Sequence, residues 1–362
     1  MSVISFKCPN CDGELIFDPA SGAYKCEYCA SHFTQEELDV LKPAEEAEKA
    51  VGSMDGATGS NADASASEED AASAVIYNCP SCGAQIVTDE TTAATFCYYC
   101  QNPVVLSGRL SGEYLPDKVI PFAIDRKEAT DLFMKYVGKK KFIPRAFFNK
   151  KQIDKLSGVY FPFWVYDAKM KGAMDAEAKQ VRVWMSGEEE YTETKLYAVE
   201  RDGEIELRNL ELNALKKANK ELVEGVLPYQ FDKMKDFSMG YLSGFLAEKR
   251  DIAKEAVSKE AVRETEDYAK KLLRESITGY TAVNVRSCNF TAKTEGWHYV
   301  LLPIWTITYR AANGRIFYYS LNGQTGKVCG ELPVNYKKLT LVSGLISAVI
   351  LATGLLGGLL IW

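Results

Sequence analysis

Histidine is almost missing from this sequence, and so is any surplus of positive charge. Two of the 362 residues are histidine, and 43 Lys and Arg stand against 49 Asp and Glu, for a net charge of −6. A protein that binds nucleic acid through the phosphate groups of the nucleic acid has a positively charged surface. The composition therefore gives no support to general nucleic-acid binding, and it leaves little room for histidine-based catalysis.

Cysteine is scarce after the first hundred residues. Cys288 and Cys329 are the two that follow, and the other eight form four Cys-x-x-Cys pairs. A disulfide scaffold spreads its cysteines through a small secreted domain, whereas clustered pairs in a long chain indicate metal ligands in a reducing compartment. The opening residues MSVISFKC lack the basic and apolar segments of a signal peptide. We therefore expect the cysteine-rich part to lie in the cytoplasm.

The clustered cysteines form two repeated units, CPNC and CEYC, then CPSC and CYYC. Two residues between cysteines let both thiolates face one metal, and a hairpin-length spacer brings the second pair opposite. Each unit resembles a TFIIB-type zinc ribbon. The predicted ligands are Cys8, Cys11, Cys26 and Cys29 in the first unit, and Cys79, Cys82, Cys97 and Cys100 in the second.

Both predicted sites are structural, because four cysteines leave no coordination position for a substrate or an activated water. We expect two Zn²⁺ ions, with iron in a rubredoxin-like site as the main competing metal. His32 lies three residues after Cys29, and we interpret it as a surface residue beyond a complete ligand set. Tyr98 and Tyr99, inside the last pair, could stack on bases, pack the ribbon or contact a protein.

The chain divides into five predicted segments. Residues 1–36 and 75–111 are the two ribbons, and residues 37–74 are an acidic linker rich in Ala, Ser and Gly. Such a composition cannot bury enough apolar surface to fold, so we expect a flexible linker and ribbons that act independently. Residues 112–336 form a larger domain, and residues 339–362 form an apolar tail.

The larger domain has the pattern of a mainly antiparallel α+β fold. Residues 125–140 have helical spacing after an Asp cap, and residues 158–170 read as a buried strand with Pro162 at an edge or bulge. The expected order continues with strands separated at Gly187 and Gly203, helices at about 209–224 and 251–277, and strands over 297–333 with turns at Asn313-Gly314 and Asn322-Gly323. Strands, helices and strands without βαβ alternation indicate the α+β class.

This domain shows no recognisable catalytic constellation. Its one histidine, His298, lies between Trp297 and Tyr299, and we interpret it as a strand residue. The stretch GQTGK has its glycines too close together for a phosphate loop, and Val328 stands where such a loop needs Ser or Thr. We therefore predict that the protein is not an enzyme.

Residues 135–155 form a basic segment with interleaved phenylalanines. Its basic residues are Lys135, Lys139, Lys140, Lys141, Arg145, Lys150, Lys151 and Lys155, against the single acid Asp154. Such a segment could contact anionic lipid head groups, at about 1 kcal/mol per basic residue. It could also contact nucleic acid, or be a solvated surface with its aromatic side chains turned inward.

Residues 339–362 have no charged side chain. A helix of that length measures about 36 Å and can cross a hydrocarbon core of about 30 Å. Lys337 and Lys338 precede it, so we expect a tail-anchored, single-pass protein of the cell membrane with its N-terminal domains in the cytoplasm. The small residues Ser343, Ser347, Gly354 and Gly358 fall on one side, and that face could pack against a second copy.

Several stretches together resemble a known group. VIPFAIDRKEAT, GVYFPFWVYDA, YLSGFLAEKRDI and YVLLPIWTITYR with YYSLNGQTGKVCGELP lie between the ribbons and the apolar tail. In this order they are similar to the bacterial TFIIB-type zinc-ribbon membrane proteins of Firmicutes, which are often named primosomal helicase N′. The sequence has no helicase motor motifs. The resemblance implies a scaffold without catalytic activity, linked in some members to membrane-stress proteins of the PspA and SPFH (flotillin-like) kinds.

These observations predict a non-enzymatic adaptor anchored in the membrane, which recruits a cytoplasmic protein to the inner face of the plasma membrane. Both ribbons are acidic on balance, which favours a protein partner over nucleic acid. The alternative is a membrane-tethered nucleic-acid-binding protein that uses the ribbons and the basic segment 135–155.

Overall fold

The computed structural model describes residues 5–38, 75–83, 85–97, 100, 102–144, 153–311 and 315–361. Almost all of the predicted linker 37–74 lies outside these ranges. Residues 145–152 of the basic segment, Tyr98, Tyr99 and the predicted turn at Asn313-Gly314 also lie outside them.

The described chain is a mixed α+β structure with three sheets. The first has the order β1 (Leu15–Asp18), β2 (Ala23–Cys26), β3 (His32–Phe33), and the second pairs β4 (Val75–Asn78) with β5 (Gln85–Thr88). The third contains β6 (Thr92–Phe96), β7 (Pro103–Val105), β8 (Lys118–Val119), β9 (Ser157–Ser186), β10 (Glu189–Asn213), β11 (Lys235–Asp236), β12 (Leu246–Glu248), β13 (Ala282–Arg310), β14 (Ile316–Asn322) and β15 (Val328–Gly330).

Most strand pairs are antiparallel, and the parallel ones are β12 with β9 and β13 with β8.

The helices are α2 (Arg126–Gly138), α4 (Lys220–Gly225), α5 (Lys254–Glu275) and α6 (Tyr336–Ile361), with 3₁₀ turns η2 (Ser107–Arg109), η3 (Gly112–Tyr114), η5 (Phe231–Lys233) and η6 (Met239–Leu242). The predicted α+β class with a mainly antiparallel sheet is therefore confirmed.

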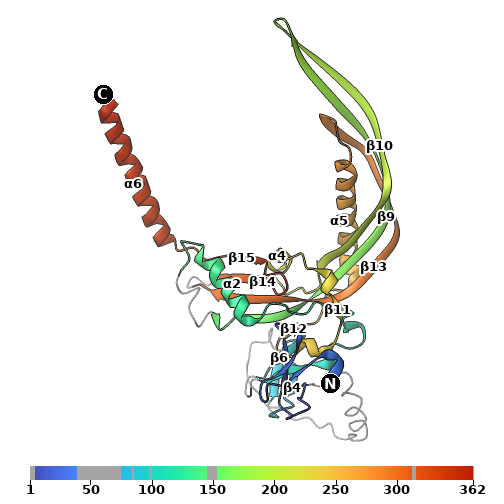
Figure 1. Cartoon of the computed structure of the whole chain (residues 1–362), viewed down its shortest axis with the longest axis vertical. Coiled ribbons are helices and arrows are strands. Elements are labelled where there is room, and N and C mark those ends of the chain that lie inside the picture. The colour runs from blue at the N-terminus through green and yellow to red at the C-terminus, as the bar shows by residue number, and fades with distance from the viewer. Residues whose placement is uncertain are drawn as a thin grey trace, which may run out of the picture.

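Three very long strands organise the larger domain. β9 pairs with β10 on one side and with β13 on the other, and Figure 1 shows the three continuing beyond the body as a curved ribbon. Helix α5 lies along one face of this ribbon. The strand residues beneath it alternate with exposed ones, and they are small or flexible: Ala168, Met170, Met174, Ala176 and Ala178. This alternation lets the helix approach the sheet closely while the opposite face stays polar.

The sequence correctly located α2, α5 and the buried start of β9. The Asp125 carboxylate accepts a hydrogen bond from the Glu128 N–H, as an N-cap does. Along β9, the pairing with β12 ends at Tyr160 and the pairing with β10 covers residues from Phe163 onward, so Pro162 lies between the two. Its missing N–H therefore faces a gap between two neighbouring strands, in agreement with the expected local edge.

Two predictions for β10 were wrong. Gly203 does not separate two strands, because β10 continues through it opposite Gly172. The helix expected at about 209–224 is limited to α4, and residues 209–213 belong to β10. A bulge at Asn209, whose N–H donates to the Asp167 carboxylate, keeps the strand in register past the Arg208-Asn209 pair. The apolar spacing in this region therefore reflects a strand with a bulge, which periodicity alone misreads as a helix.

The core of the larger domain is aromatic. Phe122 stacks on Phe245 with ring centroids 4.2 Å apart, and Tyr160 and Trp305 meet Phe122 edge-on at 5.0 and 5.2 Å. The Trp305 indole N–H donates to the Ile124 carbonyl at 2.9 Å, so its one polar group is satisfied inside the core. Gly158 faces this cluster, and a Cβ there would lie 2.7 Å from the Phe245 ring.

Helix α6 stands apart from the rest of the chain. None of its described side chains is buried, and Tyr336–Gly354 is long and apolar enough to cross a membrane. The N–H of Asn335 donates to the Phe142 carbonyl at 2.6 Å, and Lys338 Nζ donates to the Lys141 carbonyl at 2.9 Å. Figure 1 shows the helix running away from the body after these contacts.

We expect Gly158→Ala to lower the free energy of unfolding by about 1–3 kcal/mol, because its methyl group would collide with the Phe245 ring. Gly203→Ala is the matched control in a neighbouring long strand, since a Cβ there meets nothing within 4 Å. The control should be neutral or slightly stabilising. Urea unfolding followed by tryptophan fluorescence measures both, and equal effects would contradict this description of the core.

Candidate metal centres

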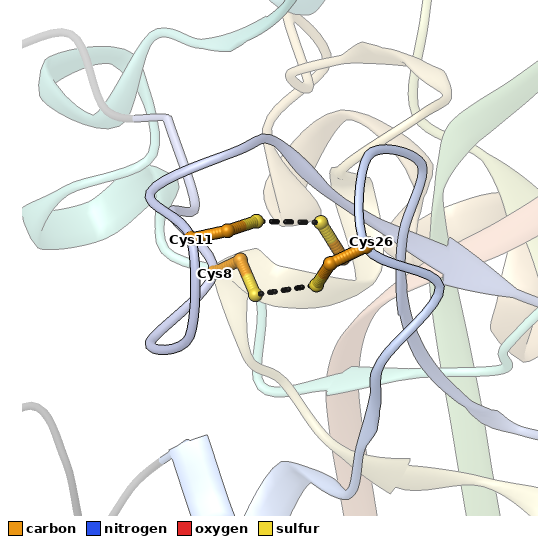
Figure 2. Close-up of side chains that lie close together, drawn as sticks. Cys8, Cys11 and Cys26 are labelled. Atoms are coloured by element: carbon orange, nitrogen blue, oxygen red, sulfur yellow. Dashed lines mark hydrogen bonds between the residues drawn. The ribbon is translucent and has the colours of Figure 1, made fainter.

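The first centre is a compact cluster of four thiols. The Sγ atoms of Cys8 and Cys29 lie 3.6 Å apart, and those of Cys11 and Cys26 lie 3.5 Å apart. Figure 2 shows Cys8 and Cys11 facing Cys26 across the loop. Four sulfurs at about 2.3 Å from a zinc ion are about 3.8 Å from one another in a tetrahedron. The observed cluster therefore has the size of a tetrahedral four-sulfur site.

Backbone hydrogen bonds hold the two turns that present these thiols. The Cys8 N–H donates to the Gly13 carbonyl at 2.7 Å, and the Cys26 N–H donates to the Ser31 carbonyl at 2.9 Å. Gly13 is needed for a steric reason, since a Cβ there would lie 3.2 Å from the Cys26 sulfur and 3.3 Å from the Cys11 sulfur. The turn is therefore shaped around the sulfur cluster.

The second centre repeats the first. The Sγ atoms of Cys79 and Cys100 lie 3.6 Å apart, and those of Cys82 and Cys97 lie 3.7 Å apart. The Cys97 N–H donates to the Asn102 carbonyl at 2.9 Å, the same bond that Cys26 makes with Ser31. All eight predicted ligands thus lie in two groups that can each hold a metal ion.

The chemistry of the thiols fits a bound dication. Burial raises the pKa of the Cys100 thiol to about 12, so the thiol would stay protonated at neutral pH without a neighbouring cation. Hydrogen bonds from Ser31 lower the pKa of Cys29 to about 6. A metal ion is what allows four crowded sulfurs to be thiolates together. Zn²⁺ and iron both suit such a donor set, and His32, exposed on β3, lies outside it.

The first ribbon is docked on the larger domain. The rings of Phe17 and Tyr24 pack with Tyr241, at centroid distances of 5.2 and 6.4 Å. The Ser243 hydroxyl donates to the Leu15 carbonyl at 2.5 Å, and the Phe17 N–H donates to the Ser243 carbonyl at 3.1 Å. These contacts are buried, so this ribbon forms part of the folded body.

Glu14 joins the two ribbons. One of its carboxylate oxygens accepts hydrogen bonds from Ser81 at 2.9 Å and Asn102 at 3.0 Å, both in the second ribbon, and Lys7 pairs with it at 2.6 Å. The Glu14 side chain is only 12% exposed. The prediction that the ribbons act as independent heads is therefore wrong, since they contact each other and the larger domain.

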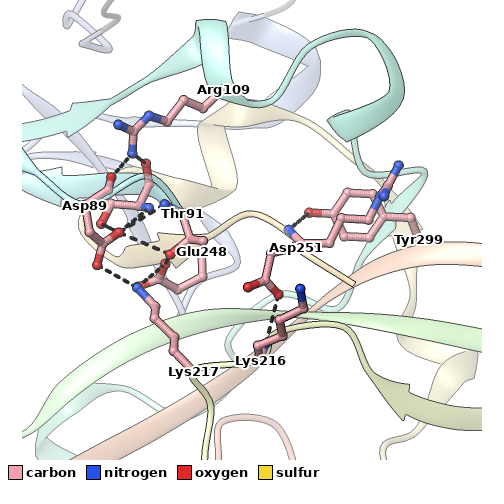
Figure 3. Close-up of polar contacts among 10 residues, drawn as sticks. Asp89, Thr91, Arg109, Lys216, Lys217, Glu248, Asp251 and Tyr299 are labelled. Atoms are coloured by element: carbon pink, nitrogen blue, oxygen red, sulfur yellow. Dashed lines mark hydrogen bonds and ion pairs between the residues drawn. The ribbon is translucent and has the colours of Figure 1, made fainter. Parts of the chain in front are cut away.

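A polar network attaches the second ribbon to the larger domain (Figure 3). Lys217 Nζ lies 2.7 Å from the Asp89 carboxylate and 2.8 Å from that of Glu248, which also accepts the Thr91 hydroxyl. Strand β12, which contains Glu248, pairs with β6 of the ribbon. Buried Arg109 fixes the other side of the loop by donating to the Thr92 carbonyl at 2.7 Å.

The charges in this network are strongly coupled. Burial disfavours ionisation of Asp89, but hydrogen bonds from Lys217 and Thr92 outweigh it and hold the pKa of Asp89 well below its usual range. Glu248 is buried more deeply, and this burial raises its pKa despite the neighbouring Lys217. The two carboxylates in turn raise the pKa of Lys217 against the effect of its own burial. Lys217 is therefore charged at neutral pH and offsets both acids.

Arg250 fixes the segment that follows the second ribbon. Its guanidinium lies 5.0 Å from the ring centroids of Tyr114 and Trp164 and 5.7 Å from that of Tyr299. It also donates to the Glu113 carbonyl at 2.6 Å. Three aromatic rings and a carbonyl thus hold one cation, which links η3 to β9 and β13.

Sequence reasoning missed these docking residues. Tyr241, Ser243, Glu248 and Arg250 all lie in YLSGFLAEKRDI, which attracted notice only through its resemblance to other proteins. A signal was present, since aromatic, small and charged residues occur together in this short stretch without helical or strand periodicity. His298, as expected, is a strand residue, in β13 opposite Val165.

Comparisons with known proteins give one relative to report. The chain is 32% identical over 361 residues to the uncharacterized protein YdjG of Bacillus subtilis (strain 168), a match that covers 98% of this chain and 99% of that protein. No family model matches the chain, and no solved structure matches it. Identity at this level over both full lengths shows common descent.

We expect the purified protein to contain two metal ions per chain, and Cys8→Ser/Cys11→Ser to contain one, because each cluster has its own four ligands. Elemental analysis by mass spectrometry measures the metal content and separates zinc from iron. Cys288→Ser is the matched control and should keep both ions, since Cys288 lies in β13 outside either cluster. Retention of both ions by the double variant would contradict the assignment of Cys8 and Cys11 as ligands.

We expect Lys217→Met to lower the free energy of unfolding by about 1 kcal/mol at pH 7, because Asp89 and Glu248 lose their shared cation. A larger loss is not expected, since the Lys217 side chain is 41% exposed and water screens both ion pairs. The deficit should shrink towards about pH 5, because Glu248, with its raised pKa, protonates first and removes the uncompensated charge.

Chemical unfolding of both proteins at the two pH values measures this difference. Lys216→Met is the control, since the contact that Lys216 makes with Asp251 uses its backbone N–H. A deficit that is unchanged or larger at pH 5 would mean that the acids are not the cause.

Proposed function

We propose that this chain, which belongs to the same family as YdjG of Bacillus subtilis, is a non-enzymatic adaptor that recruits a cytoplasmic protein to the inner face of the cell membrane. The observation that supports this most directly is the combination of two closed four-cysteine clusters with an apolar, exposed helix on one folded body. The resemblance noted from the sequence suggests a setting in the membrane-stress response.

In this proposal both metals are structural Zn²⁺ ions. All four donors of each cluster are thiols, so a tetrahedral ion there has no position left for a substrate. The chain's own residues then shape a rigid surface around each metal. Tyr28, between Cys26 and Cys29 in the first ribbon, is 90% exposed. A large, rigid aromatic side chain in this position suits contact with a partner protein.

Helix α6 serves as the anchor in this proposal, and basic residues surround its start. Lys141 and Lys338 are linked through the hydrogen bond between Lys338 Nζ and the Lys141 carbonyl, and the exposed Lys139, Lys140 and Lys337 lie close to them in the chain. Basic residues next to a membrane-crossing helix favour the cytoplasmic leaflet, at about 1 kcal/mol each near anionic lipid. This arrangement supports a cytoplasmic position for the ribbons.

The same lysines are the observation that favours the second candidate, a membrane-tethered nucleic-acid-binding protein. Lys135, Lys139, Lys140 and Lys141 lie at the end of α2 and just after it. Binding through such residues weakens steeply as salt rises, because phosphate contacts release counterions. Their closeness to the first turn of α6 makes lipid head groups the simpler ligand.

The adaptor proposal is tested by affinity capture from nuclease-treated membranes in detergent, with bound proteins identified by mass spectrometry. We expect one defined protein with the wild type, and its loss with Tyr28→Ala. Tyr268→Ala, an exposed tyrosine on α5, is the matched control and should retain the partner. The tyrosine pair is more informative than a cysteine variant, because loss of a metal would also disturb the docked ribbons.

Two results would count against the adaptor. Capture that appears only when nuclease is omitted, and that disappears at high salt, would favour the nucleic-acid candidate. Equal retention by both tyrosine variants and by Cys8→Ser/Cys11→Ser would remove the first ribbon from the binding surface.

A further inference from the structure

The two cysteine turns of the first centre are tied together by polar side chains. The Asn10 amide donates to the Ser31 hydroxyl at 3.0 Å and so joins the two turns directly. Asn10 lies between Cys8 and Cys11, and Ser31 follows Cys29 by two residues. The first ribbon therefore contains its own tie between the turns that present its thiols.

The second centre has the same two positions with the residue types exchanged. In the repeat, Ser81 takes the position of Asn10, and Asn102 takes that of Ser31. Ser81 and Asn102 both donate to the Oε1 atom of Glu14, at 2.9 and 3.0 Å. The tie between the turns of the second centre is therefore supplied by a residue of the first ribbon.

Both donors belong to the turns that present the thiols of the second centre. Ser81 lies in the turn between Cys79 and Cys82. The Asn102 carbonyl accepts the Cys97 N–H at 2.9 Å, so Asn102 is part of the other turn. The carboxylate thus holds one residue in each turn. Residues that hold metal ligands from outside in this way fix the orientation of the ligands and tune the affinity for the metal.

The position of Glu14 is set by the first centre. Glu14 follows Gly13, whose carbonyl accepts the Cys8 N–H at 2.7 Å, and a Cβ at Gly13 would lie 3.2 Å from the Cys26 sulfur. Lys7, next to Cys8, forms a β-bridge with Glu14 and places its Nζ 2.6 Å from the Glu14 Oε1. A change in the first sulfur cluster would therefore move the carboxylate on which the second centre depends.

The other oxygen of this carboxylate, Oε2, is buried and has no hydrogen-bond partner in the described part of the chain. The donors from Lys7, Ser81 and Asn102 all reach Oε1. A buried oxygen without a partner lowers stability, so stability alone does not explain this arrangement. The carboxylate is placed for the contact between the ribbons, while its own solvation is incomplete.

We propose that Glu14 is a positioning residue for the second centre and that, through it, the two centres hold their metal ions cooperatively. With its ion bound, the first centre fixes the turn that carries Glu14, and Glu14 keeps the two cysteine turns of the second centre at the spacing of a closed site. Coupling of this kind is reciprocal in affinity, so either ion favours binding of the other. It depends only on the two metal centres and is independent of the adaptor role.

The test uses the full-length protein in detergent, loaded with Zn²⁺, and follows the transfer of zinc to a coloured chelator. Glu14→Leu removes the shared acceptor. It should release one of its two ions at least about tenfold faster than the wild type, because loss of an outer partner of this kind weakens metal binding about 10–100-fold. Glu36→Leu is the matched control, since Glu36 is an exposed glutamate of the same ribbon, and it should release both ions at the wild-type rate.

Cooperation between the centres is tested by combining variants. Cys8→Ser/Cys11→Ser keeps only the ion of the second centre, and it should release this ion as fast as Glu14→Leu releases its faster ion. Adding Glu14→Leu to this double variant should cause no further increase, since Glu14 is then no longer held in place.

Two milder variants separate positioning from a general loss of structure. Glu14→Gln keeps an acceptor oxygen in the same place and should release zinc more slowly than Glu14→Leu. Ser81→Ala removes one donor in an exposed turn, where folding is not at risk. It should speed release from the second centre, and this effect should disappear in the Glu14→Leu background.

Three results would overturn the proposal. The first is release of both ions from Glu14→Leu at the wild-type rate. The second is release of the remaining ion from Cys8→Ser/Cys11→Ser at that rate. The third is the full effect of Glu14→Leu persisting in the cysteine double variant, which would make Glu14 a local support of the second centre without coupling to the first.

Discussion

The placement of both metal centres depends on the packing of one ring. Phe245 is stacked on Phe122 and packed near Tyr160 and Trp305 in the middle of the larger domain. The residues just before it contact the first ribbon, and Glu248, just after it, belongs to the network that holds the second. Since a buried aromatic ring of this size cannot shift without disturbing its neighbours, the segment around it transmits the position of the core to both ribbons.

Local patterns in the sequence were sufficient for the metal centres and insufficient for their surroundings. The spacing of the cysteines alone predicts the two Cys-x-x-Cys turns of each centre. The Asp125 cap and the apolar spacing predict α2. The attachment of the ribbons depends instead on pairs far apart in the chain, such as Glu14 with Asn102 and Asp89 with Lys217. A flexible linker composition says nothing about such pairs, because docking is decided by the surfaces at its two ends.

The long sheet shows the same division between local and distant information. Alternation predicts strands, but it does not show that β9 and β10 continue for 30 and 25 residues, because Gly187 and Gly203 look alike in the sequence. The turn forms at Gly187, whose φ is +68°. Gly203 lies opposite Gly172, where the missing side chain leaves room for Phe290 and Leu273. Glycine is therefore required at Gly172 by its packing against distant residues, whereas Gly203 has no such requirement, and no local pattern reveals this difference.

The exposed face of this sheet sets a condition on α6. Ion pairs such as Lys169 with Glu206, Lys293 with Glu204 and Arg286 with Glu177 cover that face, and groups of this kind do not enter hydrocarbon. Figure 1 shows α6 and the long hairpin leaving the body in the same direction. If α6 is the membrane anchor proposed above, a bilayer around it in this arrangement would enclose the charged sheet. The chain at Asn335, just before α6, is then where the angle between anchor and body would have to change to keep the sheet in water.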